Sequence, residues 1–295
     1  MRVFVTGSGG HIGTAVVSEL VRAGHSVVGL VRSDSSAQHV AGLGAAVVQG
    51  DVNDVERLRS LVEDVDAVVH LAYDHAAIAV GDLTTAADAD VLVVRAFGDA
   101  LADTGKTFIG IGFAPTGNPE IDRVLEANPR SAVAREVAGL EGRGIRSLLM
   151  AIPPVTHSDR DRGGFIPTVI RIARDTKVSG YVDEGRNHWP AVHTLDLATL
   201  YRLALEKAPA GTQIIGAAEP GVVVRDIAES VGRHLGVPVE SIPAADAERH
   251  FAPFGFMGMD IQMPNEATRR LLDWEPTHPT LLEDLEAGHY FTESR

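Results

Sequence analysis

Short apolar runs alternate with amphipathic segments along the first half of the chain. Residues Val3–Val5 are apolar and predict a buried strand, and the segment from Thr14 to Gly24 has apolar residues at helical spacing and ends in glycine. The same order of strand and helix recurs to about residue 151. Such an alternation predicts a doubly wound parallel sheet with right-handed crossovers, which is an α/β fold.

The apolar pattern also sets the expected bounds of these elements. The predicted strands are Val3–Val5, Ser26–Val31, Ala45–Gln49, Ala67–Ala72, Thr107–Gly112, Arg146–Ala151 and Gln213–Ala217. The predicted helices are Thr14–Gly24, Val55–Val62, about Val80–Thr104, Thr168–Thr176, His193–Glu206, Val224–Leu235 and Asn265–Leu272. The pattern becomes less regular after Ala151, beginning with Pro153 and Pro154, and this change predicts a second, smaller domain.

A glycine-rich turn follows the first predicted strand. Gly7, Gly10 and Gly13 stand at three-residue spacing between that strand and the next helix. Glycine lets the backbone approach a pyrophosphate closely, and the N–H groups at a helix start attract its charge. An ordinary strand-to-helix turn would not need three glycines, so the order predicts a dinucleotide site. The turn residues expected to contact the cofactor are Gly7, Gly10, His11, Ile12 and Gly13.

Polar residues follow the second predicted strand, at the position where a doubly wound fold meets the adenosine ribose. Arg32 and Ser33 stand there in place of the acidic residue that would bind a free 2′-hydroxyl. A guanidinium and a hydroxyl favour a 2′-phosphate, so the sequence predicts NADP(H) as the preferred cofactor. Asp34 could still reach a ribose, which leaves NAD(H) possible.

Composition and charge narrow the partners of the chain. Its 295 residues include 26 basic and 40 acidic side chains, and the net charge of −14 disfavours nucleic acid and anionic membranes. Cysteine is absent, and the 12 histidines show no ligand spacing, so no metal site is expected. The first strand begins at Val3 and no apolar run could span a bilayer, so we expect a cytoplasmic protein without a signal peptide. The expected state is a monomer or homodimer.

Short motifs stand at intervals along the whole chain. They are Thr6-Gly7-x-x-Gly10-x-x-Gly13, Gly50-Asp51-Val52, Val69-His70-Leu71-Ala72, Pro153-Pro154-Val155 and Trp189-Pro-Ala-Val-His193-Thr-Leu-Asp196. Together they resemble the epimerase-like branch of the extended short-chain dehydrogenase/reductases. The resemblance implies a Rossmann NAD(P)-binding domain of residues 1–152 and 191–218, and a substrate-binding domain of residues 153–190 and 219–295. It also implies cofactor contacts at Asp51 and Val52, which would meet the adenine, and at Leu71, Ala72, Pro153 and Pro154.

The catalytic part of this family pattern is missing. Family members have a Ser or Thr after the fifth strand, where this chain has Gly112. They also have a Tyr four residues before a Lys on the next helix, and the matching positions hold Asn128 and Ala132. No Tyr-x-x-x-Lys occurs among the 4 tyrosines, so the usual proton donor and its lysine are both absent.

Atypical members of this kind include the tyrosine-lacking ketoreductases, such as those of simocyclinone biosynthesis, which the chain resembles. That resemblance implies NAD(P)H-dependent reduction of a ketone on a bulky aromatic polyketide, in antibiotic biosynthesis. A bound, oriented nicotinamide supplies the difficult chemistry. The proton would come from a neighbouring phenol of the substrate or from water. A further candidate donor is Tyr73, which follows the fourth predicted strand and could instead pack against the cofactor ribose.

Two stretches of the second domain are candidate substrate contacts. His157 and Ser158 follow the Pro-Pro turn, and they could line a pocket or belong to a solvated loop. A segment that mixes large apolar residues with glycine and proline is typical of a lid or pocket wall for a flat ligand. Core packing or a dimer contact is the alternative for this segment. Its candidate residues are Phe251, Phe254, Phe256 and Met257.

Two further functions are compatible with a chain that has the cofactor-binding turn but lacks the catalytic residues of the family. One is a redox-silent NADP(H)-binding protein that regulates a partner. The other is a non-redox isomerase or cyclase. The Phe- and Met-rich segment favours the reductase, because it suggests a pocket for a bulky ligand. No Gly-x-Ser-x-Gly elbow is present to indicate a hydrolase.

Overall fold

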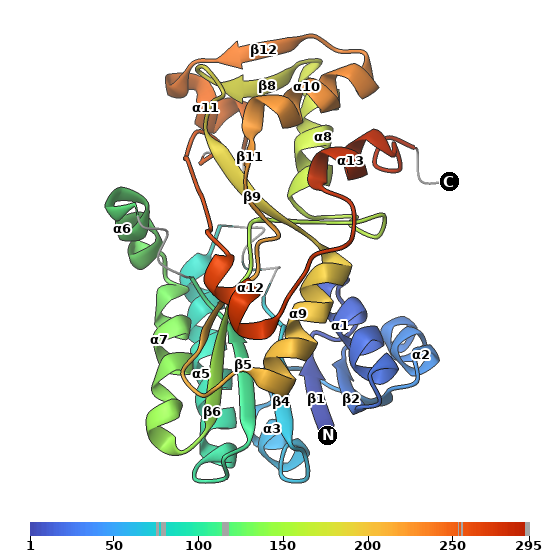
Figure 1. The fold of residues 1–295 in the computed structure, drawn as a ribbon, viewed down its shortest axis with the longest axis vertical. Helices are drawn as coiled ribbons and strands as arrows, with labels where there is room; N and C mark the ends of the chain where they lie inside the picture. Colours follow the sequence, from blue (N-terminus) through green and yellow to red (C-terminus); the bar gives the residue numbers. More distant parts are fainter. Residues whose placement is uncertain (75–76, 78–80, 114–117, 253, 255, 293–295) are drawn as a thin grey trace. The chain divides into compact units, whose positions relative to one another are not determined.

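The computed structural model describes residues 1–74, 77, 81–113, 118–252, 254 and 256–292, which form two compact units (Figure 1). The first unit contains Met1–Ile152, Leu197–Gly216 and Ala267–Trp274. The second contains Pro153–Asp196, Ala217–Glu266 and Glu275–Arg295.

These bounds differ from the predicted domains in three places. Residues 191–196 and 217–218 lie in the second unit rather than the first, and Ala267–Trp274 lie in the first rather than the second. Contacts of this last segment explain its place. The Thr268 hydroxyl accepts the N–H of Ile215 at 2.8 Å, and Trp274 is fully buried. A short amphipathic segment of this kind gives no sign in the sequence of the core that it joins.

The first unit is built on a parallel sheet of seven strands. Their order is β10-β6-β5-β4-β1-β2-β3, and every neighbouring pair is parallel. Strands β1, β4 and β5 are almost wholly buried apolar runs, as expected for a sheet covered on both faces. The predicted α/β fold is thus confirmed. The strands are β1 Arg2–Thr6, β2 Ser26–Val31, β3 Ala46–Gln49, β4 Ala67–His70, β5 Thr107–Ile111, β6 Arg146–Ala151 and β10 Gln213–Ile215.

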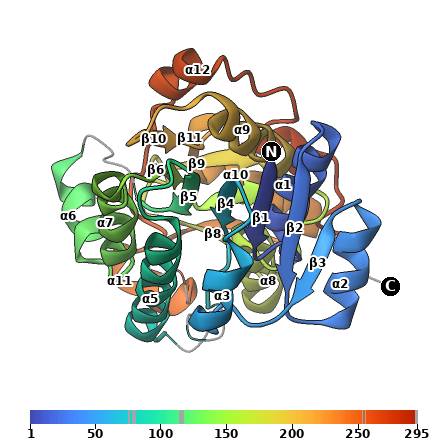
Figure 2. The same ribbon diagram turned by 90° about the horizontal axis from the view of Figure 1, so that it is seen from below.

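Helices cover both faces of this sheet. Figure 2 shows α3, α5 and α7 along one face and α1 and α9 along the other. Phe4, Phe97 and Phe108 meet under the first group, with ring centroids 5.7–6.3 Å apart where they pair. The helices are α1 His11–Arg22, α2 Asp34–Gly42, α3 Val55–Leu61, α5 Leu83–Leu101, α6 Pro119–Ala127, α7 Ser131–Gly139, α9 Thr194–Lys207 and α12 Glu266–Leu272, with a 3₁₀ turn at Glu141–Arg143.

Some helices differ from the sequence prediction. Helix α1 begins at His11 rather than Thr14. Gly13 is a poor helix former and therefore hides the true start in the sequence, but it lies in the first turn, packed against the Gly7 carbonyl. Helices α2 and α6 were not predicted, since each buries only one side chain and therefore has little apolar periodicity. Their signals are their caps, because Ser33 and Asn118 accept backbone N–H groups at the two helix starts.

The second unit combines two small sheets with helices around its own core. Strands β11, β9 and β7 form one sheet, in which β9 pairs antiparallel with β11 and parallel with β7. Strands β8 and β12 form a parallel pair. The core residues include Trp189, Phe165 and Phe251. The elements are β7 Val155–His157, α8 Phe165–Thr176, β8 Ser179–Val182, β9 His188–His193, β11 Glu219–Val223, α10 Val224–Leu235, β12 Val239–Ile242, α11 Ala244–His250 and α13 Leu281–Glu286.

Candidate active site

The turn after β1 is shaped by contacts that only glycine permits. Gly7 has a φ of +64°, and a Cβ there would lie 2.8 Å from the amide nitrogen of Ala72. A Cβ on Gly13 would lie 2.0 Å from the Gly7 carbonyl oxygen, which accepts the N–H of Gly10 at 3.0 Å. Helix α1 then begins without a side-chain cap on its N-cap residue, Gly10. A tight glycine backbone at a helix start is a cradle that fits a pyrophosphate.

A buried relay of side chains holds this turn against β4. The Thr6 hydroxyl oxygen accepts the N–H groups of Leu71 and Ala72, each at 3.1 Å. Its own proton is therefore donated to Nδ1 of His70, 2.7 Å away. Because Nδ1 of His70 accepts, the ring proton sits on Nε2 and is donated to Oδ1 of Asp90 at 2.7 Å. The relay fixes the backbone at 71–72, where cofactor contacts are predicted.

The sequence pattern alone predicts no role for Thr6 or Asp90. Asp90 lies on α5 at helical spacing from Ala86 and Val94, and all three are buried. A carboxylate within the apolar stripe of a helix requires a polar partner. That spacing, together with the histidine at the end of β4, was the available signal.

The residues after β2 form the predicted ribose site. Arg32 is exposed, and its guanidinium makes no ion pair or hydrogen bond within the described part of the chain. Ser33 caps α2 by accepting the N–H of Ser36 at 3.2 Å. The Asp34 carboxylate accepts from the Gln49 side chain at 3.1 Å. The position of Arg32 suits a phosphate ligand, and its cofactor role stays a prediction.

The other predicted cofactor contacts lie either in a turn of the first unit or at the start of the second unit. Asp51 is exposed and accepts the N–H of Asn53 at 2.8 Å, while Val52 packs against the core. Pro153 is buried and Pro154 exposed, directly before β7 in the second unit. These contacts also remain predictions.

The residues at two of the missing catalytic positions make packing or helix-capping contacts. A Cβ on Gly112 would lie 2.6 Å from Cδ1 of Leu149 and 2.8 Å from Cβ of Ala134. The space of a serine or threonine side chain is therefore already filled. Asn128 ends α6, and its Oδ1 accepts the N–H of Arg130 at 3.0 Å.

Tyr73 lies three residues beyond the end of β4 and is half-buried. The guanidinium carbon of Arg130 stands 4.0 Å from the centroid of its ring. Burial raises the pKa of the Tyr73 hydroxyl above its ordinary value of 10.0, while the charge of Arg130 opposes this rise. Tyr73 is thus a neutral phenol near pH 7 and can donate a proton.

Ala132, which stands where family members have the lysine, lies in the first turn of α7.

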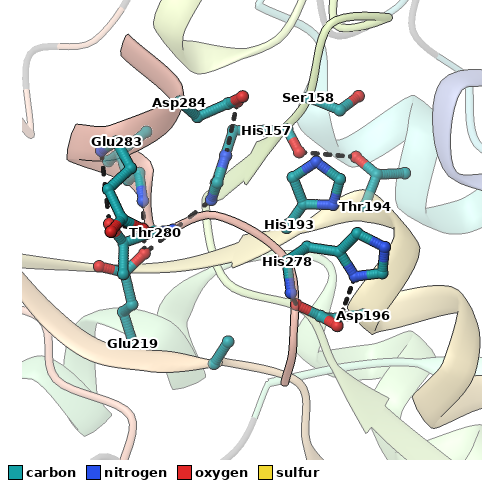
Figure 3. A network of polar contacts seen from close by, with 12 residues as sticks. His157, Ser158, His193, Thr194, Asp196, Glu219, His278, Thr280, Glu283 and Asp284 are labelled. Carbon is teal, nitrogen blue, oxygen red and sulfur yellow. Dashed lines mark hydrogen bonds and ion pairs between the residues drawn. The ribbon is translucent and has the colours of Figure 1, made fainter. Parts of the chain in front are cut away.

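In the second unit, His157 and Ser158 belong to a buried polar network rather than to a solvated loop (Figure 3). His157 is fully buried, with Nδ1 2.9 Å from Oδ2 of Asp284 and Nε2 3.9 Å from Oε1 of Glu219. The N–H of Ser158 donates to the hydroxyl oxygen of Tyr290 at 3.0 Å. The Ser158 side chain is buried too, and its hydroxyl oxygen accepts the N–H of Arg160 at 3.2 Å. A substrate role for both residues stays a prediction.

His193 lies at the centre of this network. Its ring meets the His157 ring edge to face at 5.4 Å and stacks on the His278 ring at 4.8 Å. Burial, followed by the proximity of the two other imidazoles, lowers the pKa of His193 from 6.5 to about 4. His193 is accordingly neutral at neutral pH. The ring of His278 is held by Asp196, whose Oδ1 lies 2.7 Å from Nδ1.

The predicted pocket-wall segment is divided between core and surface. Phe251 and Met257 are buried in the core of the second unit, which favours the core-packing alternative for these two residues. Phe254 is partly buried, and Phe256 is 41% exposed. Phe256 stacks on Trp189 at 5.2 Å. Of the four candidate residues, Phe254 and Phe256 are therefore the two that are not fully buried.

Among the described residues, no group of three or more His, Cys, Asp or Glu side chains could hold a metal ion. A search of the same part of the chain finds no helix that is long and apolar enough to cross a membrane.

Comparisons with known proteins agree with the cradle geometry. The model of an NAD(P)H-binding family matches residues 7–136. An uncharacterized protein of Schizosaccharomyces pombe is 34% identical over 99% of this chain and 100% of its own length, and one of Saccharomyces cerevisiae is 36% identical over 98% and 99%. A 4-hydroxy-2-methyl-3-oxo-4-farnesyl-3,4-dihydroquinoline-1-oxide ketoreductase of Stigmatella aurantiaca is 28% identical over 72% of this chain and 66% of its own. UDP-glucose 4-epimerase of Thermotoga maritima shares the fold, with a TM-score of 0.75 at 20% identity over 99% of this chain and 98% of that one.

The Thr6 relay can be tested by replacing one atom. Thr6→Val keeps the shape of the side chain but leaves two N–H groups and His70 without their partner, which costs about 1–3 kcal/mol of stability. We expect a lower thermal unfolding temperature and weaker NADPH binding in a fluorescence titration. Thr6→Ser retains the hydroxyl and should stay close to the wild type. Equal behaviour of the two variants would contradict the relay.

The pKa of His193 predicts a dependence of stability on pH. An unfolded histidine titrates near 6.5, whereas His193 in the folded protein titrates near 4. Between these values the unfolded chain takes up a proton that the folded chain does not, so the free energy of unfolding falls as the pH drops from 6.5 towards 4. In urea unfolding at stepped pH, His193→Asn should flatten this fall, and His39→Asn, at an exposed position, should not. A wild-type slope that survives His193→Asn would refute the assignment.

Proposed function

Because the chain belongs to the NAD(P)H-binding Rossmann family, we propose that it is an NAD(P)H-dependent reductase acting on the ketone of a bulky, apolar substrate. The observation that carries the proposal is the cradle after β1. Gly7 and Gly13 pack so closely that no other residue fits, and buried side chains hold the neighbouring backbone.

NADP(H) is the cofactor that we propose as preferred. Arg32 offers a guanidinium at the end of β2 without an acidic partner in the described structure, and Ser33 lies beside it. The carboxylate of Asp34, the residue that would favour NAD(H), is already engaged by Gln49. The charge of this corner therefore supports a 2′-phosphate rather than a free 2′-hydroxyl.

The second unit supports a flat, apolar substrate. Trp189 stacks on both Phe165 and Phe256, with ring centroids 4.1 and 5.2 Å away, and the Phe254 ring lies 4.8 Å from that of Phe165. Phe256 exposes part of its ring on this stack, so an aromatic ligand can extend it. The Stigmatella relative is named for a ketone on a ring system with a farnesyl chain, a substrate of the same general kind. We further propose that this substrate is the ketone of an aromatic polyketide in antibiotic biosynthesis.

The proposal is tested by following NADPH absorbance at 340 nm with purified protein and a panel of polycyclic aromatic ketones. We expect oxidation of NADPH with at least one ketone and formation of the alcohol. Tight NADPH binding without turnover on any ketone would instead favour the redox-silent regulatory protein. Conversion of a substrate without net oxidation of NADPH would favour an isomerase or cyclase.

The cofactor preference is tested by reversing one charge. Arg32→Asp should weaken NADPH binding by about 10–100-fold, roughly 1.4–2.8 kcal/mol, because a carboxylate repels the 2′-phosphate. NADH binding should change much less. Arg123→Asp, which makes the same charge change at an exposed position of α6, serves as the control. Equal weakening of both cofactors by Arg32→Asp would contradict the phosphate role.

A further inference from the structure

The reductase proposal leaves a chemical problem at the site. Reduction adds a hydride equivalent from the dihydronicotinamide to the carbonyl carbon, and the π electron pair moves to the oxygen. That oxygen needs positive charge nearby and then a proton. The family positions for these roles hold Asn128 and Ala132, neither of which can supply a charge or an acid.

Arg130 lies between these two positions and carries an uncommitted charge. It is half-buried at the N-cap of α7, and its Nε is buried without an acceptor in the described part of the chain. No carboxylate among the described residues forms an ion pair with it. Withdrawing a guanidinium from water without an anionic partner is costly. The face of Tyr73 at 4.0 Å offsets only part of that cost, about 0.5–2 kcal/mol.

The topology of the first unit puts this pair where ligands bind. Tyr73 follows β4, and the glycine turn follows β1, its neighbour in the sheet. These two strands flank the point where the strand order reverses, and open parallel sheets bind ligands at the carboxyl ends of such strands. Helix α7 precedes β6 and returns the chain to the opposite edge, so its first residues also lie at the carboxyl edge.

We infer that Arg130 and Tyr73 together bind the reducible carbonyl oxygen. The guanidinium of Arg130 stabilises the negative charge that forms on this oxygen, and the phenol of Tyr73 gives it the proton. The resulting tyrosinate stays beside Arg130 until water returns a proton. Arg130 is thus a catalytic residue that takes over the electrostatic part of the missing lysine, from another position in the chain. The inference rests on the proposed ketone reduction.

An arginine and a tyrosine together can stabilise the charge on the carbonyl oxygen and protonate it. A guanidinium keeps its charge throughout the working pH range and offers several N–H donors to one oxygen. Burial raises the pKa of Tyr73, and the nearby carboxylates of Asp90 and Asp74 raise it further, whereas Arg130 lowers it. Arg130 is therefore the group that makes Tyr73 a usable acid.

A first measurement of the pair needs neither cofactor nor substrate. The pKa of Tyr73 can be followed by NMR in protein labelled with ¹³Cζ-tyrosine, with Tyr73→Phe to assign its signal. We expect Arg130→Met to raise this pKa by about one unit or more, and Arg130→Lys to keep most of the wild-type value. Arg135→Met removes an exposed charge from the same helix and should leave the signal unchanged. An unchanged pKa in Arg130→Met would overturn the inference.

The second measurement is turnover of NADPH with a ketone that the wild type reduces. Arg130→Met should lower kcat about 10²–10³-fold, with Arg130→Lys recovering part of the loss and the Kd of NADPH near the wild-type value. Tyr73→Phe should lower kcat about 10²–10⁴-fold. Wild-type turnover that survives in Arg130→Met would overturn the inference alone. A wild type that binds NADPH and reduces no ketone would overturn the proposed function, and the inference with it.

Discussion

The close approach of Gly7 to the amide of Ala72 is the contact on which the site depends. It joins the end of β1 to the end of β4, and it exists only because Gly7 has no Cβ and adopts a positive φ. The Thr6 hydroxyl oxygen accepts the N–H of the same amide, its own proton goes to His70, and His70 donates to Asp90. Buried polar groups of this kind are stable only when every partner is present. The cradle is therefore rigid before any ligand arrives.

The positions that hold catalytic residues in the resembled family contain other residues here, beside an intact cradle. Gly112 is packed against Leu149 and Ala134, so the lost hydroxyl position has been absorbed into the core of the first unit. Asn128 caps the end of α6, and the positive charge of Arg130 lies over the ring of Tyr73. In the proposed function, cofactor binding and proton supply are thus separate structural problems, and the Arg130–Tyr73 pair is the solution that we propose for the second.

The fold was predictable because apolar strands and glycine spacing are local signals. The sheet and the turn follow from residues close in sequence, such as Val3–Val5 with Gly7. The relay was not predictable, since only the fold brings Thr6 of β1 and Asp90 of α5 to the two sides of the His70 ring at the end of β4. Arg130 was missed for the same reason, because its partner Tyr73 is distant in the chain. Phe251 belongs to a segment whose composition is typical of a pocket wall. It is nevertheless buried in the core, through packing that the sequence pattern does not specify.

Transfer of a deuterium label from the cofactor shows whether the protein reduces a ketone. The protein is incubated with a ketone and NADPH deuterated at C4 of the nicotinamide, in each of the two stereochemical forms, and the product is examined by mass spectrometry and NMR. Ketone reduction at this site predicts one deuterium on the carbinol carbon from one form and none from the other. A product formed without deuterium from either form would contradict it.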